Sequence, residues 1–303
     1  MKILQCFTIA DKQTGLFILR AFKELGHYVE VVDSKKEPER TASVCDKMRP
    51  DLVFCSRELG LLSPVKYIRK KYPSIKTVCW NVDKRDTVKQ FKGLLSLFNS
   101  VHIFYTIAKG NIPEYKKLCP NTIVKHLQQG TDLTSYGEQH VSDEDHSKYD
   151  CDIMFAGALN PIHKDRKEIV LHLKNRFNMK IFGADGRNRI LDTEHSKACR
   201  CTKICLSHNG WPNISCSSSF RIYKIISAGG FCLEQNSEGM SDFFDGGLIT
   251  YTTKEDCEKK VRYYLDNEDE RKENVVSMQK LVCEKHRYID RMKTVINDIS
   301  TLE

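Results

Sequence analysis

A run of serines followed by an arginine is the segment of this sequence best suited to bind an anion. Residues 215–219 read Ser-Cys-Ser-Ser-Ser, and the stretch with helical spacing that begins at Ser219 carries Arg221. Hydroxyl groups, backbone N–H groups at a helix start and a guanidinium are donors that bind phosphate oxygens. Gly157 and Gly183 follow two other apolar runs, where a glycine lets backbone approach a ligand closely. Together they predict a diphosphate site; the alternative is that Ser219 is only a helix N-cap and Arg221 a solvated charge.

A cluster of cysteine and histidine residues suggests a second chemistry, the binding of zinc. Cys199, Cys201, Cys205 and His208 are residue types that ligate this metal. Their spacing is irregular for a structural zinc site, and Cys205 falls inside an apolar run. We therefore predict no metal site here and interpret the cysteines as free thiols. His208, just past that run, becomes a candidate for the phosphate site instead.

Carboxylates that follow apolar runs in the first half of the chain could act as a general base toward a hydroxyl group. Asp11, Glu58 and Asp83 hold such positions, and we favour Asp83, with Asp11 as the second catalytic candidate. The alternative for Asp83 is an N-cap of the helix expected after it. Residues 150–152, Asp-Cys-Asp, resemble a metal-binding aspartate pair, but they precede a strand instead of ending one, so we interpret them as structural.

The elements that must position these residues alternate between strand and helix length. Alternation of this kind predicts a doubly wound parallel sheet, in which the carboxyl ends of the strands share one edge. The expected strands of the first half are 1–9, 28–32, 52–55, 77–80 and 101–105, with helices 16–25, 64–71 and 88–97. In the second half we expect strands 152–156, 180–183, 203–206, 230–233 and 248–251, with helices 165–177, 219–227 and from 254 onward.

Length and pattern indicate two domains, because 303 residues is about twice a common domain size. The strand and helix pattern breaks near Asp132 and restarts after a polar segment. We predict a Rossmann-like N-terminal domain over 1–134, a linker over 135–150, and a Rossmann-like C-terminal domain over 151–285. The last segment, 286–303, is expected to be a helix that packs back on the N-terminal domain.

Composition is that of a folded soluble protein, with 40% hydrophobic and 29% charged residues. We find no apolar run long enough for a signal peptide or a membrane span, and we expect a cytoplasmic protein. The thirteen cysteines are scattered, as buried thiols in a reducing compartment are. A net charge of +8 favours polyanionic partners or is simply a solvated basic surface. The basic segments 66–71 and 84–85 are the places where nucleic acid would bind.

Motifs spread over residues 203–291 carry a family resemblance. In order they are Ile204-Cys-Leu-Ser207, Ser219-Phe-Arg-Ile-Tyr223, Ser227-Ala-Gly-Gly-Phe231, Glu238-Gly-Met-Ser-Asp-Phe-Phe244, Val261-Arg-Tyr-Tyr-Leu265 and His286-Arg-Tyr288. Their order and spacing resemble the CgeB-like (spore-maturation) glycosyltransferases, which have the GT-B fold. The resemblance is looser over residues 1–130.

The resemblance implies an α/β fold of GT-B type, with two Rossmann-like domains whose parallel sheets face each other across a cleft. It also implies a metal-independent hexosyl- or pentosyltransferase whose co-substrate is a nucleotide sugar, with no other cofactor. The C-terminal domain would bind this donor, and the N-terminal domain the acceptor. The acceptor stays open between a hydroxymethylated DNA base, a polysaccharide, a protein and a small molecule.

The resemblance further implies which residues bind the donor, and one of them departs from the family pattern. The expected donor-binding residues are Gly157, Arg166, Gly183, His208, Ser219, Arg221, Tyr223 and Lys224. Many retaining GT-B enzymes bind the ribose with a glutamate where this chain has Lys224. A lysine cation accepts no hydrogen bond from ribose hydroxyls, so either Lys224 contacts phosphate instead or the ribose is held elsewhere, and both alternatives leave the donor and the stereochemical outcome open. The alternative function is a non-catalytic nucleotide-sugar-binding protein of the same fold.

Overall fold

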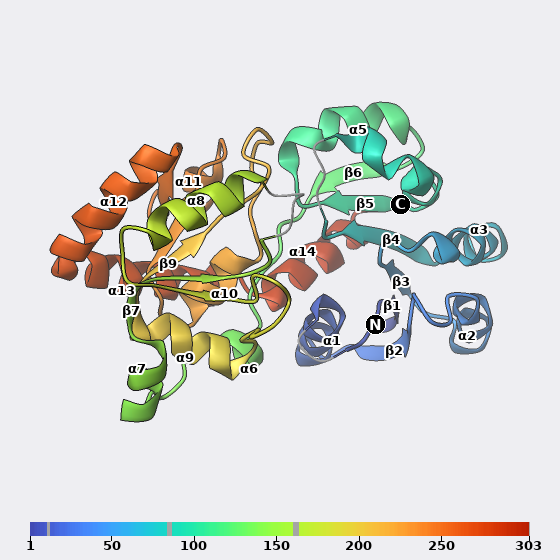
Figure 1. Ribbon diagram of the computed structural model, residues 1–303. Coiled ribbons are helices and arrows are strands. Elements are labelled where there is room, and N and C mark those ends of the chain that lie inside the picture. Colours follow the sequence, from blue (N-terminus) through green and yellow to red (C-terminus); the bar gives the residue numbers. More distant parts are fainter. Residues whose placement is uncertain (11–12, 84–86, 160–163, 303) are drawn as a thin grey trace. The chain divides into compact units, whose positions relative to one another are not determined.

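The computed structural model describes residues 1–10, 13–83, 87–159 and 164–302, which form two compact units. Unit 1 comprises Met1–Gln129 together with Tyr288–Glu303, and unit 2 comprises Gly130–Arg287. Each unit has its own parallel sheet covered by helices on both faces (Figure 1). Among the described residues, no helix is long and apolar enough to cross a membrane.

The sheet of unit 1 has six parallel strands in the order β2-β1-β3-β4-β5-β6. Its inner strands β3 and β5 are buried along their whole length, which explains why they are continuous apolar runs in the sequence. The strands are β1 (Lys2–Cys6), β2 (Tyr28–Val32), β3 (Leu52–Cys55), β4 (Lys76–Asn81), β5 (Ile103–Thr106) and β6 (Ile123–His126).

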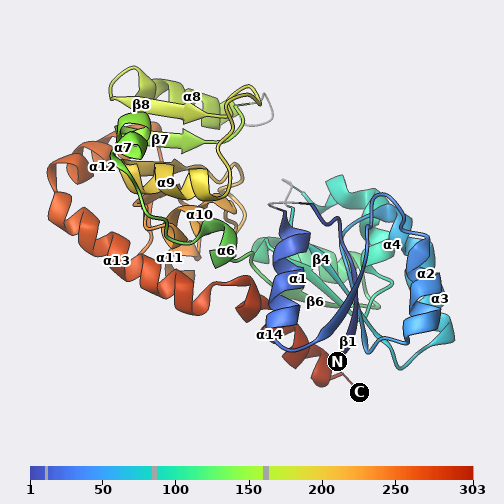
Figure 2. The same cartoon turned by 90° about the horizontal axis from the view of Figure 1, so that it is seen from below.

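Helices cover both faces of the unit 1 sheet, with α1 and α14 on one face and α2 and α3 on the other (Figure 2). The helices are α1 (Thr14–Glu24), α2 (Arg40–Met48), α3 (Leu62–Lys71), α4 (Leu95–Phe98), α5 (Ile112–Leu118) and α14 (Tyr288–Ser300), with 3₁₀ turns η1 (Leu59–Leu61), η2 (Val88–Leu94) and η3 (Lys109–Asn111). On α14, Asp298 accepts hydrogen bonds from Tyr105 (2.5 Å) and Lys125 (2.8 Å). The end of the chain therefore belongs to unit 1.

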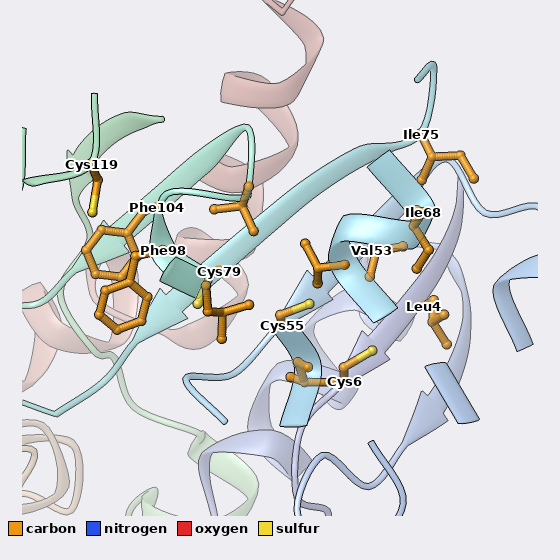
Figure 3. Packing of buried hydrophobic residues seen from close by; sticks show 14 of the residues in the cluster. Leu4, Cys6, Val53, Cys55, Ile68, Ile75, Cys79, Phe98, Phe104 and Cys119 are labelled. Atoms are coloured by element: carbon orange, nitrogen blue, oxygen red, sulfur yellow. The ribbon is translucent and has the colours of Figure 1, made fainter. Parts of the chain in front are cut away.

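The core of unit 1 on the α2 and α3 side is unusually rich in sulfur. Cys6, Cys55 and Cys79 come from three adjacent strands, and the rings of Phe98 and Phe104 stack at 4.1 Å (Figure 3). All thirteen cysteines of the chain are free thiols, and all except Cys283 are buried. They act as small apolar side chains in well-packed cores.

The sheet of unit 2 has five parallel strands in the order β11-β10-β9-β7-β8. Alternate strand residues pack under α8 and α12 on one face and under α9, α10 and α13 on the other. The strands are β7 (Cys151–Ala156), β8 (Met179–Phe182), β9 (Thr202–Ser207), β10 (Cys232–Gln235) and β11 (Ile249–Tyr251), and the helices are α6 (Leu133–Tyr136), α7 (Asp143–Tyr149), α8 (Lys164–Lys174), α9 (Thr193–Cys201), α10 (Arg221–Ser227), α11 (Met240–Phe243), α12 (Lys254–Asp266) and α13 (Glu268–Lys285).

Both sheets reverse their strand order at the same place. In each unit the first strand lies between the second and the third, so the order reverses between β1 and β3 and between β7 and β9. Ligands of open α/β sheets bind beyond the carboxyl ends of the strands at such a point. These two positions are where a site is expected.

The segment 135–150, which the sequence suggested is a linker, holds the second half of α6 and all of α7 inside unit 2. Helix α7 begins with a capping box in which Ser142 and Asp145 satisfy each other's backbone N–H groups. The polar composition of this segment is therefore that of a capped, solvent-facing helix.

Candidate functional site

A cavity of about 390 Å³ lies in unit 2 at the carboxyl ends of β7 and β8. This volume is in the range of small-molecule sites. The lining residues are Ala156, Gly157, Ala158, Phe182, Gly183, Gly186, Arg189, Ile190, Leu191, His195, Ser219, Phe220, Arg221 and Lys224. Three of them, Arg189, Arg221 and Lys224, are basic, and none of these described residues is an aspartate or glutamate.

Arg221 connects the two strands between which the sheet order reverses. Its Nε donates to the carbonyl of Ala156 at the end of β7 (2.8 Å), and its Nη1 donates to the carbonyl of His208 just past β9 (3.4 Å). Nη1 also donates to Ser219 Oγ (3.2 Å). The guanidinium stacks on the Phe155 ring, 4.8 Å from its centroid. These contacts hold the cation rigidly in the cavity wall.

Gly157 leaves room for Arg221 where it meets the loop after β7. A Cβ atom at this position would collide with Nη2 of Arg221 and would lie 3.3 Å from the Phe155 ring. Nη2 takes part in none of the three bonds above, and it is the part of the guanidinium nearest to this glycine. The glycine thus lets a cation and a backbone segment approach closely.

Arg166 and His208 lie behind the residues that line the cavity and are not among the lining residues themselves. Arg166 on α8 is buried and donates to the carbonyls of Ala158 (3.2 Å) and His208 (3.4 Å). Burial, and then the charge of Arg221, lower the pKa of Arg166 to about 10. The His208 ring is buried and lies 3.0 Å from the hydroxyl of Tyr251. Both predicted donor-binding residues are therefore one layer away from a ligand in the cavity.

Lys224 lies one helical turn after Arg221 on α10 and faces the same cavity. Its Nζ is 4.3 Å from the ring centroid of Tyr136 and 4.4 Å from that of Phe220. Burial, and then the charges of Arg221 and Arg189, lower the pKa of Lys224 to about 7. The same surroundings, burial first, lower the pKa of His195 on α9 to about 3, so this imidazole is neutral at neutral pH.

Tyr223 lies in the core and not in the cavity. It is fully buried, with its ring 5.7 Å from Phe244 and 6.3 Å from His286. Residues three apart on a helix share a face, so Arg221 and Lys224 point together, whereas a residue between them points away. The motif predicted Tyr223 as a donor ligand, and the structure gives it a packing position.

The serine run contributes one residue to the cavity. Ser217 accepts a hydrogen bond through its carbonyl from Asn209 (2.5 Å) and is buried with Ser218. Helix α10 begins at Arg221 with Phe220 before it, so Ser219 is not its N-cap. Of the predicted donor-binding residues, the cavity brings together Gly157, Gly183, Ser219, Arg221 and Lys224.

Sequence reasoning missed Arg189, His195 and Phe220. Arg189 lies in the irregular segment between β8 and α9, and His195 lies in a helix whose buried face is made of small and polar side chains. One feature of the sequence could have pointed to this segment, namely the pair of glycines Gly183 and Gly186. In the structure they have φ angles of 74° and 85° and form the turn that follows β8.

The carboxylates proposed as a general base lie in unit 1. One Oδ of Asp83 forms an ion pair with Arg57, and 47% of the Asp83 side chain is exposed. The following 3₁₀ turn η2 has Thr87 before it, so Asp83 does not cap it. Glu58 directly precedes η1. Asp11 and the basic pair at 84–85 lie outside the described residues.

The Cys/His cluster is split in the structure. Cys199 Sγ lies 3.5 Å from His195 Nδ1, and Cys205 Sγ lies 3.7 Å from the carbonyl of Cys199, whereas His208 pairs with Tyr251. Within the described ranges, no group of three or more His, Cys, Asp or Glu side chains is arranged to hold a metal ion.

Comparison with solved structures identifies the fold. Sucrose-phosphate synthase from Thermosynechococcus elongatus superposes with a TM-score of 0.68 at 7% identity, over 99% of each chain. The chain has a GT-B fold. An α1,3-fucosyltransferase solved with GDP-fucose matches this GT-B chain with a TM-score of 0.53 at 11% identity, covering 91% of it and 81% of the fucosyltransferase. UDP-GlcNAc 2-epimerase from Neisseria meningitidis, bound to UDP-GlcNAc, gives 0.54 at 9% identity over 100% of both chains.

A family model described as glycosyl transferase-like matches residues 163–297 of the GT-B chain. The matched segment is just under half of the chain and contains Gly183, Ser219, Arg221 and Lys224. No curated protein matches significantly. At the low identities above, the solved structures establish the fold, and the family model adds the likeness to glycosyltransferases.

Proposed function

We propose that this chain is a glycosyltransferase that binds the nucleotide-sugar donor in the unit 2 cavity. The observation that carries the proposal is the placement of Arg221, which spans the strand ends of β7 and β9 beside Gly157. A diphosphate there would meet Nη2 of Arg221, the side chains of Arg189 and Lys224, and glycine-bearing backbone. Ser219 and Gly183 complete this part of the donor site.

These basic groups would stabilise the charge of the leaving diphosphate, as a bound metal ion does in other enzymes. When the glycosyl bond to the diphosphate breaks, negative charge develops on the leaving phosphate, and fixed cations in a half-buried wall stabilise it. Transfer is therefore proposed to be metal-independent, with no cofactor other than the nucleotide sugar. Arg166 and His208 are proposed to position the wall and not to touch the donor.

Transfer is favoured over epimerisation by the family likeness. The fold by itself also occurs in a UDP-GlcNAc 2-epimerase, so fold similarity does not separate the two reactions. The glycosyl transferase-like model covers the part of the chain that carries Arg221 and Lys224. The finer assignment to CgeB-like enzymes rests on the sequence motifs alone.

Unit 1 is proposed to bind the acceptor and to supply a base if the reaction inverts configuration. Asp83 is the favoured base, and Asp11 is the second candidate. With retention, no such base is needed and Asp83 would orient the acceptor. The acceptor hydroxyl belongs to a polysaccharide, a protein, a small molecule or a hydroxymethylated DNA base, and the net charge of +8 makes DNA worth testing.

A second candidate function rests on Lys224. Because this lysine replaces a carboxylate that would bind ribose, the chain could hold a nucleotide sugar without turning it over. Such a protein would bind the donor in the same cavity and release no nucleoside diphosphate.

The test is a panel of nucleotide sugars incubated with the protein, with and without acceptors, in the presence of a chelator. Release of nucleoside diphosphate that depends on an acceptor supports transfer. Binding without release supports the second candidate. Absence of both binding and release rejects a nucleotide-sugar site.

A further inference from the structure

Lys224 lies in a cavity wall that gathers positive charge, and its neighbours Arg221 and Arg189 oppose its own charge. Its ammonium lies against two aromatic rings, and the lining residues that the structure describes include no carboxylate. The titratable and charged groups that face it are Arg221 from α10, Arg189 and Asp192 from the segment before α9, His195 and Cys199 from α9, and Tyr136 from α6. Two of these are fixed cations, and Asp192 is the one carboxylate among them.

A half-buried lysine between two arginines holds its proton weakly. Its burial and the repulsion from Arg221 and Arg189 lower the pKa of Lys224 to about 7. Near neutral pH, without a bound anion, Lys224 is therefore only partly protonated.

We propose that Lys224 takes up a proton when the nucleotide sugar binds, so that donor and proton enter the cavity together. The inference rests on the proposed function, since it needs a diphosphate in this cavity. An anion beside the ammonium cancels the repulsion from the arginines and favours the charged form. The proton comes from the solvent, adds to the amine nitrogen, and no other bond forms or breaks.

The other groups in the wall do not share this behaviour. Arg189 and Arg221 are guanidinium cations with and without the donor. His195 starts from a pKa of about 3, so an increase of one or two units leaves it neutral at pH 7. The diphosphate of a nucleotide sugar is a diester and has no group that titrates near neutral pH. Proton uptake would therefore report on Lys224.

The sign of the pH dependence follows from linkage. Below pH 7 the lysine is already charged, and binding takes up little. Above pH 7 the amine of Lys224 must take a proton from the solvent when the donor binds, so donor affinity should fall by up to about tenfold per pH unit until the pKa of the bound state is reached. Proton uptake should therefore be larger at pH 8 than at pH 6, up to one proton per donor bound.

The experiment is isothermal titration calorimetry with UDP-GlcNAc and GDP-fucose at pH 6 and pH 8, each in two buffers that differ in ionisation enthalpy. Buffers without phosphate are used, because phosphate would compete for the cavity. The buffer dependence of the heat gives the number of protons taken up. For the wild type we expect more proton uptake at pH 8 than at pH 6.

Variants separate Lys224 from other sources of protons. Lys224→Arg keeps a permanent cation, so uptake at pH 8 should vanish and donor affinity should become independent of pH. Lys224→Met should also lose the uptake, with weaker binding at pH 6. Lys203→Met removes an exposed lysine paired with Asp152 (2.8 Å) in the same unit and should leave uptake unchanged.

Two results overturn the inference while leaving the donor site in place: binding with no proton uptake at pH 8, or uptake that persists in both Lys224 variants. If neither nucleotide sugar binds the wild type at pH 6 or pH 8 and the panel shows no turnover, the proposed function fails and this inference fails with it.

Discussion

The two sheets reverse their strand order at equivalent positions, between β1 and β3 and between β7 and β9, but different side chains surround the two positions. In unit 1, the Ser56 N–H donates to the carbonyl of Cys6 (2.9 Å) and the Ser56 hydroxyl lies 2.9 Å from that of Ser34. Nearby, Arg57 forms an ion pair with Asp83. In unit 2, the reversal point holds Arg221 beside a cavity with further basic residues.

The difference shows that the fold creates the same reversal point in both sheets, and that the side chains around it determine whether an anion could bind there. Unit 1 pairs its charges with each other, whereas unit 2 gathers like charges in a half-buried wall. Gathered like charges lower the stability of the empty protein and are expected at sites that a ligand of opposite charge completes. The predictions below test this contrast.

The largest effect is expected from Asp83→Asn, which tests the assignment of the base to unit 1. If transfer inverts configuration, kcat should fall by about 10²–10⁴-fold, because the acceptor hydroxyl loses its proton acceptor. Donor affinity should not change, since the cavity lies within unit 2. Steady-state kinetics with calorimetry checks both, and a wild-type kcat would remove Asp83 from the chemistry or indicate retention.

Arg221→Ala should weaken donor binding by about 1.5–3 kcal/mol, because a charge-assisted contact to phosphate is lost. The structure adds a second effect: two hydrogen bonds to the strand ends and one to Ser219 also disappear, so the free energy of unfolding should fall by about 1–3 kcal/mol. The matched control is Arg57→Ala in unit 1, which breaks a partly exposed ion pair with Asp83 worth about 1 kcal/mol. Equal donor affinities for the two variants would contradict the contrast between the units.

Gly157→Ala should weaken donor binding by about 1–2 kcal/mol, because its Cβ displaces the guanidinium of Arg221. Gly93→Ala in unit 1, where a Cβ meets nothing within 4 Å, is the control. Thermal unfolding and donor titration measure both variants. A Gly157→Ala protein with wild-type affinity would show that the close approach has no part in binding.

The smallest effect is expected from Lys224→Met on the empty protein, which should become more stable by about 0.5–2 kcal/mol at pH 7. The pKa of Lys224 is lowered to about 7 in the folded state, so the unfolded chain binds more protons between pH 7 and about 10. The folded state is penalised fully below pH 7, and the penalty shrinks as pH rises. Denaturation at pH 6 and pH 9 should show a gain that is larger at pH 6, and a loss of stability would contradict this.

Most of the fold could be predicted because buried parallel strands are continuous apolar runs. Two of the elements that were missed lack such a signal: β6 is a partly exposed edge strand, and the buried face of α9 consists of His, Ser, Ala and Cys instead of large apolar side chains. For the site, the serine run pointed to Arg221, and the family resemblance pointed to Lys224. Arg189 and His195 could not be found, since their approach depends on how an irregular segment folds over the end of β8.

The most direct test of the central claim, that the donor binds in the unit 2 cavity, is hydrogen exchange with and without a bound nucleotide sugar. The account predicts slower exchange of the backbone amides at 156–158 and 183–191, together with the first turn of α10. It would be contradicted if the donor binds and these amides exchange at unchanged rates, while protection is confined to strand ends of unit 1 such as 56–57.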